Sequence, residues 1–249
     1  MALNPNILND ELFDKVSESI NLQKPKRPKL RGVVDVIFLI DVSGSMGPAI
    51  DELTANIEKF IENLDENLIK EARIKIGSYS DLEVDEMRYA LNLDRPFRDK
   101  NDIENLRKDL QECRNIVEFG LGGDEPESAL DAIYRAIGEF KEEWSKRRRV
   151  IILFTDAHTK PIHSSTVEGL NPDEAFEQLK KNILKEHVDI YIYAPLDRNF
   201  ERLAREASKR VIYNAINEDG TSPVRALRNL DFSAVLETLG KSVSQPSEL

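Results

Sequence analysis

Residues 33–46 have the sequence VVDVIFLIDVSGSM, in which an almost unbroken apolar run ends at an aspartate followed closely by two serines. An apolar run without polar alternation is typical of a strand that is buried on both faces of a parallel sheet. A helical pattern begins shortly afterwards, because Ile50, Leu53, Ile57 and Phe60 recur at spacings of three and four. The stretch therefore predicts a buried strand, a tight polar turn and a helix.

The rest of the chain repeats this alternation. We predict further strands over 73–80, 87–93, 150–154, 188–194 and 210–214, and helices over 6–22, 101–111, 125–140, 172–185, 200–208 and 224–239. This order predicts an α/β fold of the Rossmann-like, doubly wound type, with a mostly parallel sheet and helices on both faces. We divide the chain into an N-terminal helix with a basic, proline-containing linker (1–31), the α/β domain (32–240) and a disordered polar tail (241–249).

The composition argues against several classes of protein. The formal net charge of -11 at pH 7 is unfavourable for general nucleic-acid affinity. No apolar run approaches the ~20 residues that a membrane-spanning helix needs, and we find no pattern of a secretory signal. Cys113 is the only cysteine, so it cannot form an internal disulfide. We therefore expect a cytoplasmic protein.

Two of the predicted buried strands end in acidic turns, at Asp41 and Asp156. Because the carboxyl ends of parallel strands meet at one edge of the sheet, where α/β proteins bind ligands, we expect both carboxylates at that edge. A third segment, GLGGDEPES at residues 120–128, is predicted to form a turn just before a helix. Carboxylate and hydroxyl oxygens are hard ligands, which suit Mg²⁺ or Mn²⁺.

In these three segments the chain resembles a von Willebrand factor A (vWA) domain with a metal-ion-dependent adhesion site, of the intracellular type. Asp41, Ser43 and Ser45 match the D-x-S-x-S signature of the family, and Asp156 matches the aspartate of its third loop. The resemblance covers roughly residues 33 to 240. It implies the vWA fold, which is the doubly wound architecture predicted above.

The second loop resembles the D-x-P-E variant found in the vWA-like domains of integrin β chains, because residues 124–127 are DEPE. Many family members use a threonine ligand in this loop, so we expect Glu127 to bind the metal here, with Asp124 as a further candidate. In the integrin β version, two acidic residues after the first motif bind a neighbouring ion. This protein has Pro48 and Ala49 there, so we expect a single ion.

The resemblance implies a metal site that holds Mg²⁺ or Mn²⁺ and is formed by Asp41, Ser43, Ser45, Asp124, Glu127 and Asp156. It implies a protein-binding or adaptor module, not an enzyme, whose protein partner donates an acidic side chain to the metal. The alternative is a metal-dependent hydrolase or phosphotransfer enzyme using the same ion. We find no convincing general base or nucleophile beside the motifs to support it.

The negative charge of this site bears on whether it can bind an acidic partner. If Asp41, Glu127 and Asp156 are all ionised, a divalent ion leaves the site near a net charge of about -1, which is unfavourable for an acidic partner. Our hypothesis is that one or two of these carboxylates act through bound water when a partner is engaged, because Mg²⁺ usually retains several waters.

Simpler interpretations of the same residues stay open. The first motif could be only a strand-to-helix turn with an N-cap, Asp124 only the N-cap of the next helix, and Asp156 only a turn residue. We predict that His158 and the acidic loop at 81–86 are solvated. We also predict that the basic run at 146–149 is an exposed helix end.

Overall fold

The computed structural model describes residues 32–66, 68–85, 90–120, 126–140, 147–163, 165–217 and 220–245. Our predictions for the N-terminal helix and linker at 1–31, and for Asp124, lie outside these residues. Among the helices that the structure describes, none has the length and apolar character needed to cross a bilayer.

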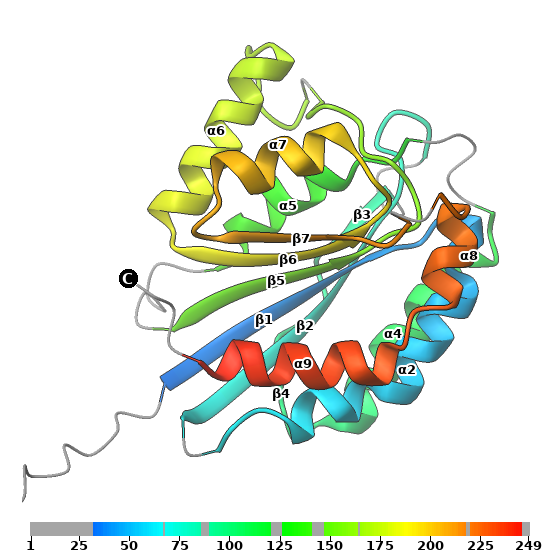
Figure 1. Ribbon diagram of the computed structural model, residues 1–249, viewed down its shortest axis with the longest axis vertical. Helices are drawn as coiled ribbons and strands as arrows, with labels where there is room; N and C mark the ends of the chain where they lie inside the picture. Colours follow the sequence, from blue (N-terminus) through cyan, green and yellow to red (C-terminus); the bar gives the residue numbers. More distant parts are fainter. Residues whose placement is uncertain are drawn as a thin grey trace, which may run out of the picture. The chain divides into compact units, whose positions relative to one another are not determined.

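The centre of the fold is a seven-stranded sheet in the order β3-β2-β1-β5-β6-β7, with β4 also paired to β2 (Figure 1). Its strands are β1 (Gly32–Asp41), β2 (Ile69–Tyr79), β3 (Leu91–Asn92), β4 (Arg98–Asp99), β5 (Arg148–Phe154), β6 (Val188–Ala194) and β7 (Val211–Ala215). The five longer strands run parallel, whereas β3 and β4 are antiparallel to β2. The predicted sheet is therefore confirmed as mostly parallel.

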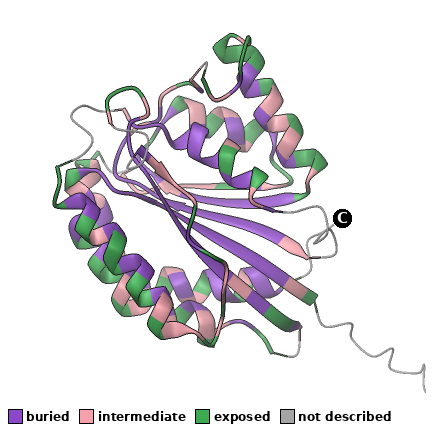
Figure 2. Cartoon of the chain, turned by 180° about the vertical axis from the view of Figure 1, so that it is seen from behind, coloured by how far each residue is buried: buried purple, intermediate pink, exposed green. Residues whose placement is uncertain are grey.

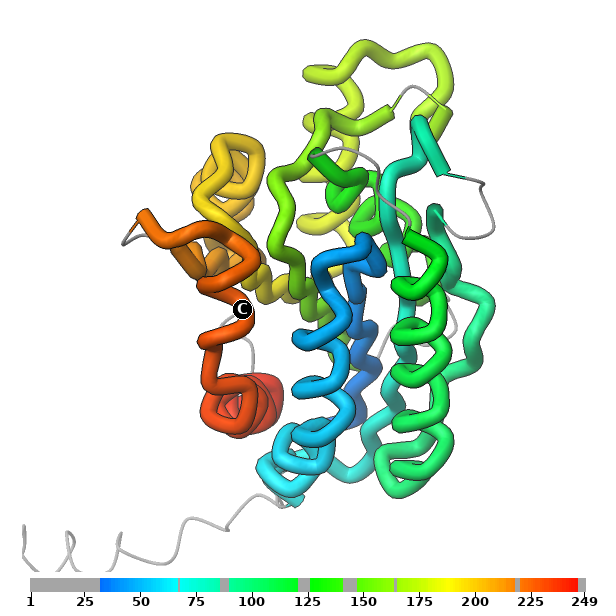
Figure 3. The backbone as a smooth tube through the Cα atoms, turned by 90° about the vertical axis from the view of Figure 1, so that its right-hand side faces the viewer, coloured from blue at the N-terminus to red at the C-terminus, as the bar shows by residue number. Residues whose placement is uncertain are grey.

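Helices cover both faces of this sheet, as predicted for a doubly wound α/β fold. One face carries α2 (Gly47–Glu62), α4 (Ile103–Val117), α8 (Pro223–Arg228) and α9 (Phe232–Ser244). The other carries α5 (Ala129–Gly138), α6 (Pro172–Lys185) and α7 (Arg198–Glu206). A short 3₁₀ helix, η1 (Gly44–Met46), joins β1 to α2. Figure 3 shows α2 and α4 side by side on their face.

The predicted central strand is confirmed as β1, and its residues alternate between two cores. Phe38 belongs to the cluster beneath α2, and its ring meets that of Phe60 edge-on at 5.2 Å between centroids. Ile37 and Leu39 belong to the cluster beneath α5, α6 and α7. Coverage of both faces explains why the strand is apolar at almost every position, and Figure 2 shows the central strands as buried.

The C-terminal region differs from our prediction of one helix over 224–239 and a disordered tail from 241. Two helices, α8 and α9, occupy it, and α9 begins at an N-cap where Asp231 accepts a hydrogen bond from the backbone of Ala234. Residues 241–244 are helical because Val243 is buried and Arg148 donates to the carbonyl oxygens of Ser242 and Val243, at 3.3 and 2.6 Å. Residues 246–249 lie outside the described part of the chain.

The basic run was also predicted wrongly, because residues 148–149 belong to β5 and not to an exposed helix end. Arg149 is buried and pairs with Glu186 at 2.7 Å. Arg147 donates to the buried carboxylate of Asp35, also at 2.7 Å. These arginines form ion pairs at the amino edge of the sheet. Their partners are distant in sequence, so a local run of basic residues does not predict these pairs.

Candidate metal centre

The first and third loops meet at the carboxyl edge of the sheet. β1 and β5 are neighbours in register, with Ile40 opposite Phe154, so the residues that follow each strand lie next to each other. The Thr155 hydroxyl donates to Asp41 Oδ2 at 2.5 Å, and the Ser45 hydroxyl donates to Asp156 Oδ1 at 2.9 Å. The prediction that Asp41 and Asp156 share this edge is confirmed.

Asp41 shapes the first loop. Its Oδ1 accepts a hydrogen bond from the Ser43 backbone N–H at 2.8 Å, which closes a turn directly after β1. Neither η1 nor α2 has a side-chain cap, so N-capping does not explain the two serines of the motif. Asp41 is fully buried and Ser43 nearly so, which is costly for polar groups unless they are satisfied.

The second loop reaches the same place through Glu127. Its backbone N–H donates to the His158 carbonyl oxygen at 2.9 Å, and its own carbonyl oxygen accepts from the Lys160 N–H at 2.8 Å. These two hydrogen bonds join the second loop to residues 158–160, which follow Asp156 in the third loop. α5 begins at Ala129, four residues later than the predicted start at 125. Residues 121–125 lie outside the described part of the chain, so Asp124 stays a prediction.

The buried carboxylates repel one another and resist ionisation. Burial raises the pKa of Asp41 from 3.8 to about 7, and the nearby charge of Asp156 adds to this while the Thr155 hydrogen bond opposes it. Burial, followed by the charges of Asp41 and other acids, raises the pKa of Glu127 from 4.5 to about 9. A cation placed among these groups favours their ionised forms.

Of the buried polar atoms that have no hydrogen-bond partner among the described residues, three come from segments near this edge of the sheet: Ser43 Oγ, Glu127 Oε2 and Tyr79 Oη. An unsatisfied buried polar group costs about 1–3 kcal/mol. Ser43 and Glu127 offer hard oxygens, which are the donors that Mg²⁺ and Mn²⁺ prefer. The donor chemistry therefore fits the expected ion.

The described residues contain no group of three or more His, Cys, Asp or Glu side chains placed to hold a metal together. An ion at this edge therefore also needs hydroxyl or water ligands. Mg²⁺ accepts such a set, because it usually retains several waters in octahedral geometry.

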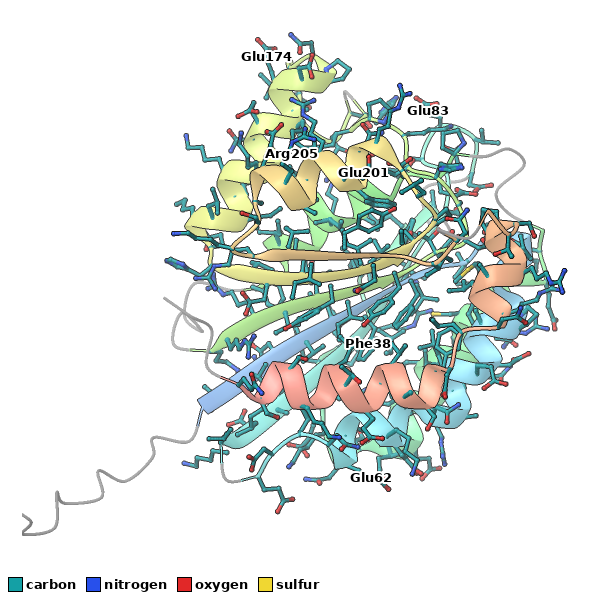
Figure 4. All side chains as sticks on the ribbon, in the orientation of Figure 1. Phe38, Glu62, Glu83, Glu174, Glu201 and Arg205 are labelled. Atoms are coloured by element: carbon teal, nitrogen blue, oxygen red, sulfur yellow. The ribbon has the colours of Figure 1, made fainter. Side chains whose placement is uncertain are left out.

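The acidic loop after β2 is only in part the solvated face that we predicted, because Glu83 is exposed but Asp81 is not. Asp81 is fully buried, and its Oδ2 accepts from Lys160 Nζ at 2.6 Å. The same ammonium contacts Glu83 Oε2 at 3.0 Å, and Figure 4 shows Glu83 at this edge of the molecule. Lys160 also lowers the raised pKa of Glu127 through its charge, although burial and the nearby acids outweigh it.

Three residues near the site were missed by sequence reasoning: Tyr79, Asp81 and Lys160. The one signal available was the position of Lys160, four residues after Asp156 in the third loop. His158, which we predicted to be solvated, is partly exposed: 45% of its side chain is accessible, and its Nδ1 lies 3.5 Å from Asp197 Oδ2.

Comparison with known proteins agrees with this architecture. The family model described as von Willebrand factor type A domain matches residues 35–237. In structure, the chain is similar to the pilus adhesin SpaC of Lactobacillus rhamnosus GG, with a TM-score of 0.54 and 10% identity. The similarity covers 86% of this chain but only 31% of the adhesin, and at this identity it shows the fold alone. A search of curated proteins found no match. Because the family model spans most of the chain, the protein belongs to the von Willebrand factor type A domain family.

Proposed function

We propose that this protein is a cytoplasmic binding module, and not an enzyme, that engages a protein partner through a Mg²⁺ or Mn²⁺ ion at the carboxyl edge of its sheet. The main support for the proposal is that buried polar atoms without hydrogen-bond partners in the described part of the chain lie on the loops around the buried carboxylates of Asp41 and Asp156. Ser43 Oγ and Glu127 Oε2 lack partners among the described residues, and both come from loops that meet Asp41 and Asp156. Interaction with other proteins is also a common role of vWA domains.

The proposed ligand set is Asp41, Ser43, Ser45, Glu127 and Asp156, with Asp124 as a further candidate. When bound, the ion would act as a Lewis acid, and a carboxylate oxygen of the partner would coordinate to it. The chain's own residues fix the loops. Asp41 closes the first turn through the Ser43 N–H, and Ser45 joins that turn to the third loop.

The charge of the site constrains how it binds an acidic partner. If Asp41, Glu127 and Asp156 are all ionised around the ion, they carry more negative charge than one divalent ion neutralises, and Lys160 is already shared between Asp81 and Glu83. We propose that one or two of the three carboxylates contact the ion through water when the partner is bound. This arrangement leaves the ion electrophilic enough to accept a further carboxylate oxygen.

A pull-down with the full chain, performed in Mg²⁺ and in chelator, tests this function. The expected result is a partner retained in Mg²⁺, released by chelator and lost with Asp41→Ala. The matched control is Asp94→Ala, because Asp94 is an exposed aspartate in the turn after β3, and this variant should behave like the wild type. Partner binding that survives both chelation and Asp41→Ala would overturn the proposal.

A further inference from the structure

Thr155 is the first residue after β5 and is almost fully buried at the carboxyl edge of the sheet. Its backbone N–H donates to the Tyr193 carbonyl oxygen at 3.1 Å, which continues the hydrogen bonding between β5 and β6 by one residue. The preceding residue, Phe154, stacks its ring on that of Tyr193 at 5.1 Å between centroids. Thr155 is thus held by the sheet itself, and side chains on such elements are positioned more precisely than those on loops.

The Thr155 hydroxyl has a single hydrogen and two acceptors within reach. Its Oγ1 lies 2.5 Å from Asp41 Oδ2 and 3.5 Å from the Ala157 carbonyl oxygen. The shorter contact, to a carboxylate, is the stronger hydrogen bond. Oγ1 also accepts a hydrogen bond from the Ala157 N–H at 3.0 Å. The hydroxyl hydrogen is therefore directed at Asp41 whenever that carboxylate is ionised, because an ionised carboxylate can only accept.

The carboxylate of Asp41 is held at both of its oxygens. Oδ1 accepts the Ser43 backbone N–H at 2.8 Å, and Oδ2 accepts the Thr155 hydroxyl. One bond alone would let the carboxylate turn about its Cβ–Cγ bond, because this torsion has broad preferences. Two bonds from two loops fix its plane. Each carboxylate oxygen has two lone pairs, so one on each oxygen is left for an ion or for its bound water.

The two donors differ in what they are attached to. Ser43 is two residues from Asp41 and belongs to the same turn, so its N–H moves with the first loop. Thr155 is 114 positions away in sequence and is tied to β6. Its hydroxyl therefore sets the position of the Asp41 carboxylate relative to the third loop, in which Asp156 is the next residue.

We propose that Thr155 is a positioning residue for the metal centre, whose hydroxyl fixes the plane of the Asp41 carboxylate and so the direction in which Asp41 presents its remaining lone pairs to the ion. The inference rests on the proposed function, because it assigns a role within the same site. It also provides a reason for a hydroxyl side chain at a buried position that directly follows an apolar strand.

The test is the affinity for Mg²⁺ of full-length variants of Thr155, measured by isothermal titration calorimetry. Thr155→Val removes the hydroxyl with little change of shape, and we expect about a tenfold loss of affinity or more. Thr155→Ser restores the hydroxyl and should return the affinity to within about threefold of the wild type, although loss of a buried methyl group lowers its stability. The matched control is Thr54→Val, which removes a hydrogen bond to the Ile50 carbonyl oxygen in α2 and should leave the affinity unchanged.

Urea denaturation in chelator checks the fold and identifies the group through which Thr155 acts. Thr155→Val should lower the urea midpoint, because Asp41 Oδ2 and the Ala157 N–H both lose this partner. In an Asp41→Ala background the decrease should be smaller, because one of the two partners is already absent. Thr155→Cys, which keeps only the weak donor of a thiol, carries the calorimetric test if the valine variant does not fold, with an affinity below that of Thr155→Ser.

The outcomes separate this inference from the function on which it rests. Wild-type affinity in a folded Thr155→Val or Thr155→Cys variant would overturn the role of Thr155 alone, while metal binding by the wild type still supported the site. A loss of affinity that Thr155→Ser does not restore, or an undiminished midpoint change in the Asp41→Ala background, would overturn the assignment of the effect to the bond with Asp41. Absence of Mg²⁺ binding in the wild type would overturn the proposed function and the role of Thr155 with it.

Discussion

The Ser45 hydroxyl donates to Asp156 Oδ1 at 2.9 Å, across 111 positions of sequence. This bond joins the first loop to the third at the carboxyl edge of the sheet. Ser45 is partly buried, whereas Asp156 is almost fully buried. The pair therefore lies on the more exposed side of the carboxylate cluster. We expect an ion there to bind both Ser45 Oγ and Asp156 Oδ1.

Replacing Ser45 by alanine should weaken Mg²⁺ binding much more than it weakens the fold. Loss of a ligand-positioning hydroxyl is expected to reduce Mg²⁺ affinity by about tenfold or more, whereas loss of one hydrogen bond costs about 1 kcal/mol of stability. Calorimetric titration and urea denaturation measure the two effects separately. Unchanged Mg²⁺ affinity in Ser45→Ala would exclude this serine from the site.

The stability of the protein in chelator should decrease as the pH rises. Burial raises the pKa of Asp41 to about 7 and of Glu127 to about 9 in the folded chain, whereas both lie near 4 when unfolded. At pH values between the unfolded and folded pKa values, the folded state holds more protons than the unfolded state, so the free energy of unfolding falls with increasing pH. We expect this fall between about pH 5 and pH 9.

Urea denaturation across that range checks the pH dependence. Saturating Mg²⁺ should reduce the slope, because the ion binds the deprotonated carboxylates. Asp41→Asn should remove part of the slope in chelator, since asparagine does not titrate. A stability in chelator that stays constant or rises with pH would contradict the assignment of raised pKa values to these two groups.

Lys160→Met should destabilise the fold by about 3 kcal/mol, because it leaves the buried Asp81 carboxylate without its cation. Asp81 is fully buried and Lys160 Nζ lies 2.6 Å from its Oδ2. The matched control is Glu83→Gln, which removes the exposed partner of the same lysine and should cost no more than about 1 kcal/mol. Equal effects of the two substitutions in urea denaturation would show that the Asp81 pair is not the stronger interaction.

Gly240→Ala should loosen the packing of α9 against α2. A Cβ atom at position 240 would lie 2.5 Å from the Phe60 carbonyl oxygen and 2.9 Å from Asn63 Cβ, and such overpacking typically costs about 1–3 kcal/mol. Gly138→Ala is the control, because a Cβ there meets nothing within 4 Å. Thermal melting should show a lower midpoint for the first variant and an equal or higher one for the second.

Local patterns were sufficient for the elements that place the site. The apolar run of β1 and the polar turn after it predicted Asp41 at the carboxyl edge, and the second apolar strand predicted Asp156 beside it. Helix α6 and strand β6 occur at the predicted residues. Such elements are specified by hydrophobic periodicity and by turn chemistry, which are properties of neighbouring residues.

What sequence reasoning missed depends on contacts between distant segments. Asp81 was predicted to be solvated because it lies in a short acidic run, but it is buried against Lys160, 79 positions away. Tyr79 has the character of an ordinary strand residue, and only the assembled sheet places its hydroxyl among carboxylates. Residues 241–244 were predicted to be disordered because they are mostly polar, but Arg148 of β5 binds the end of their helix.

We propose that this edge of the sheet binds one divalent cation through Asp41. Isothermal titration calorimetry of the full chain with Mg²⁺, for the wild type and Asp41→Ala, tests it most directly. We predict binding of a single ion by the wild type and no measurable binding by the variant. A wild type that binds no Mg²⁺, or an Asp41→Ala variant that binds it with unchanged affinity, would contradict a metal centre at this edge.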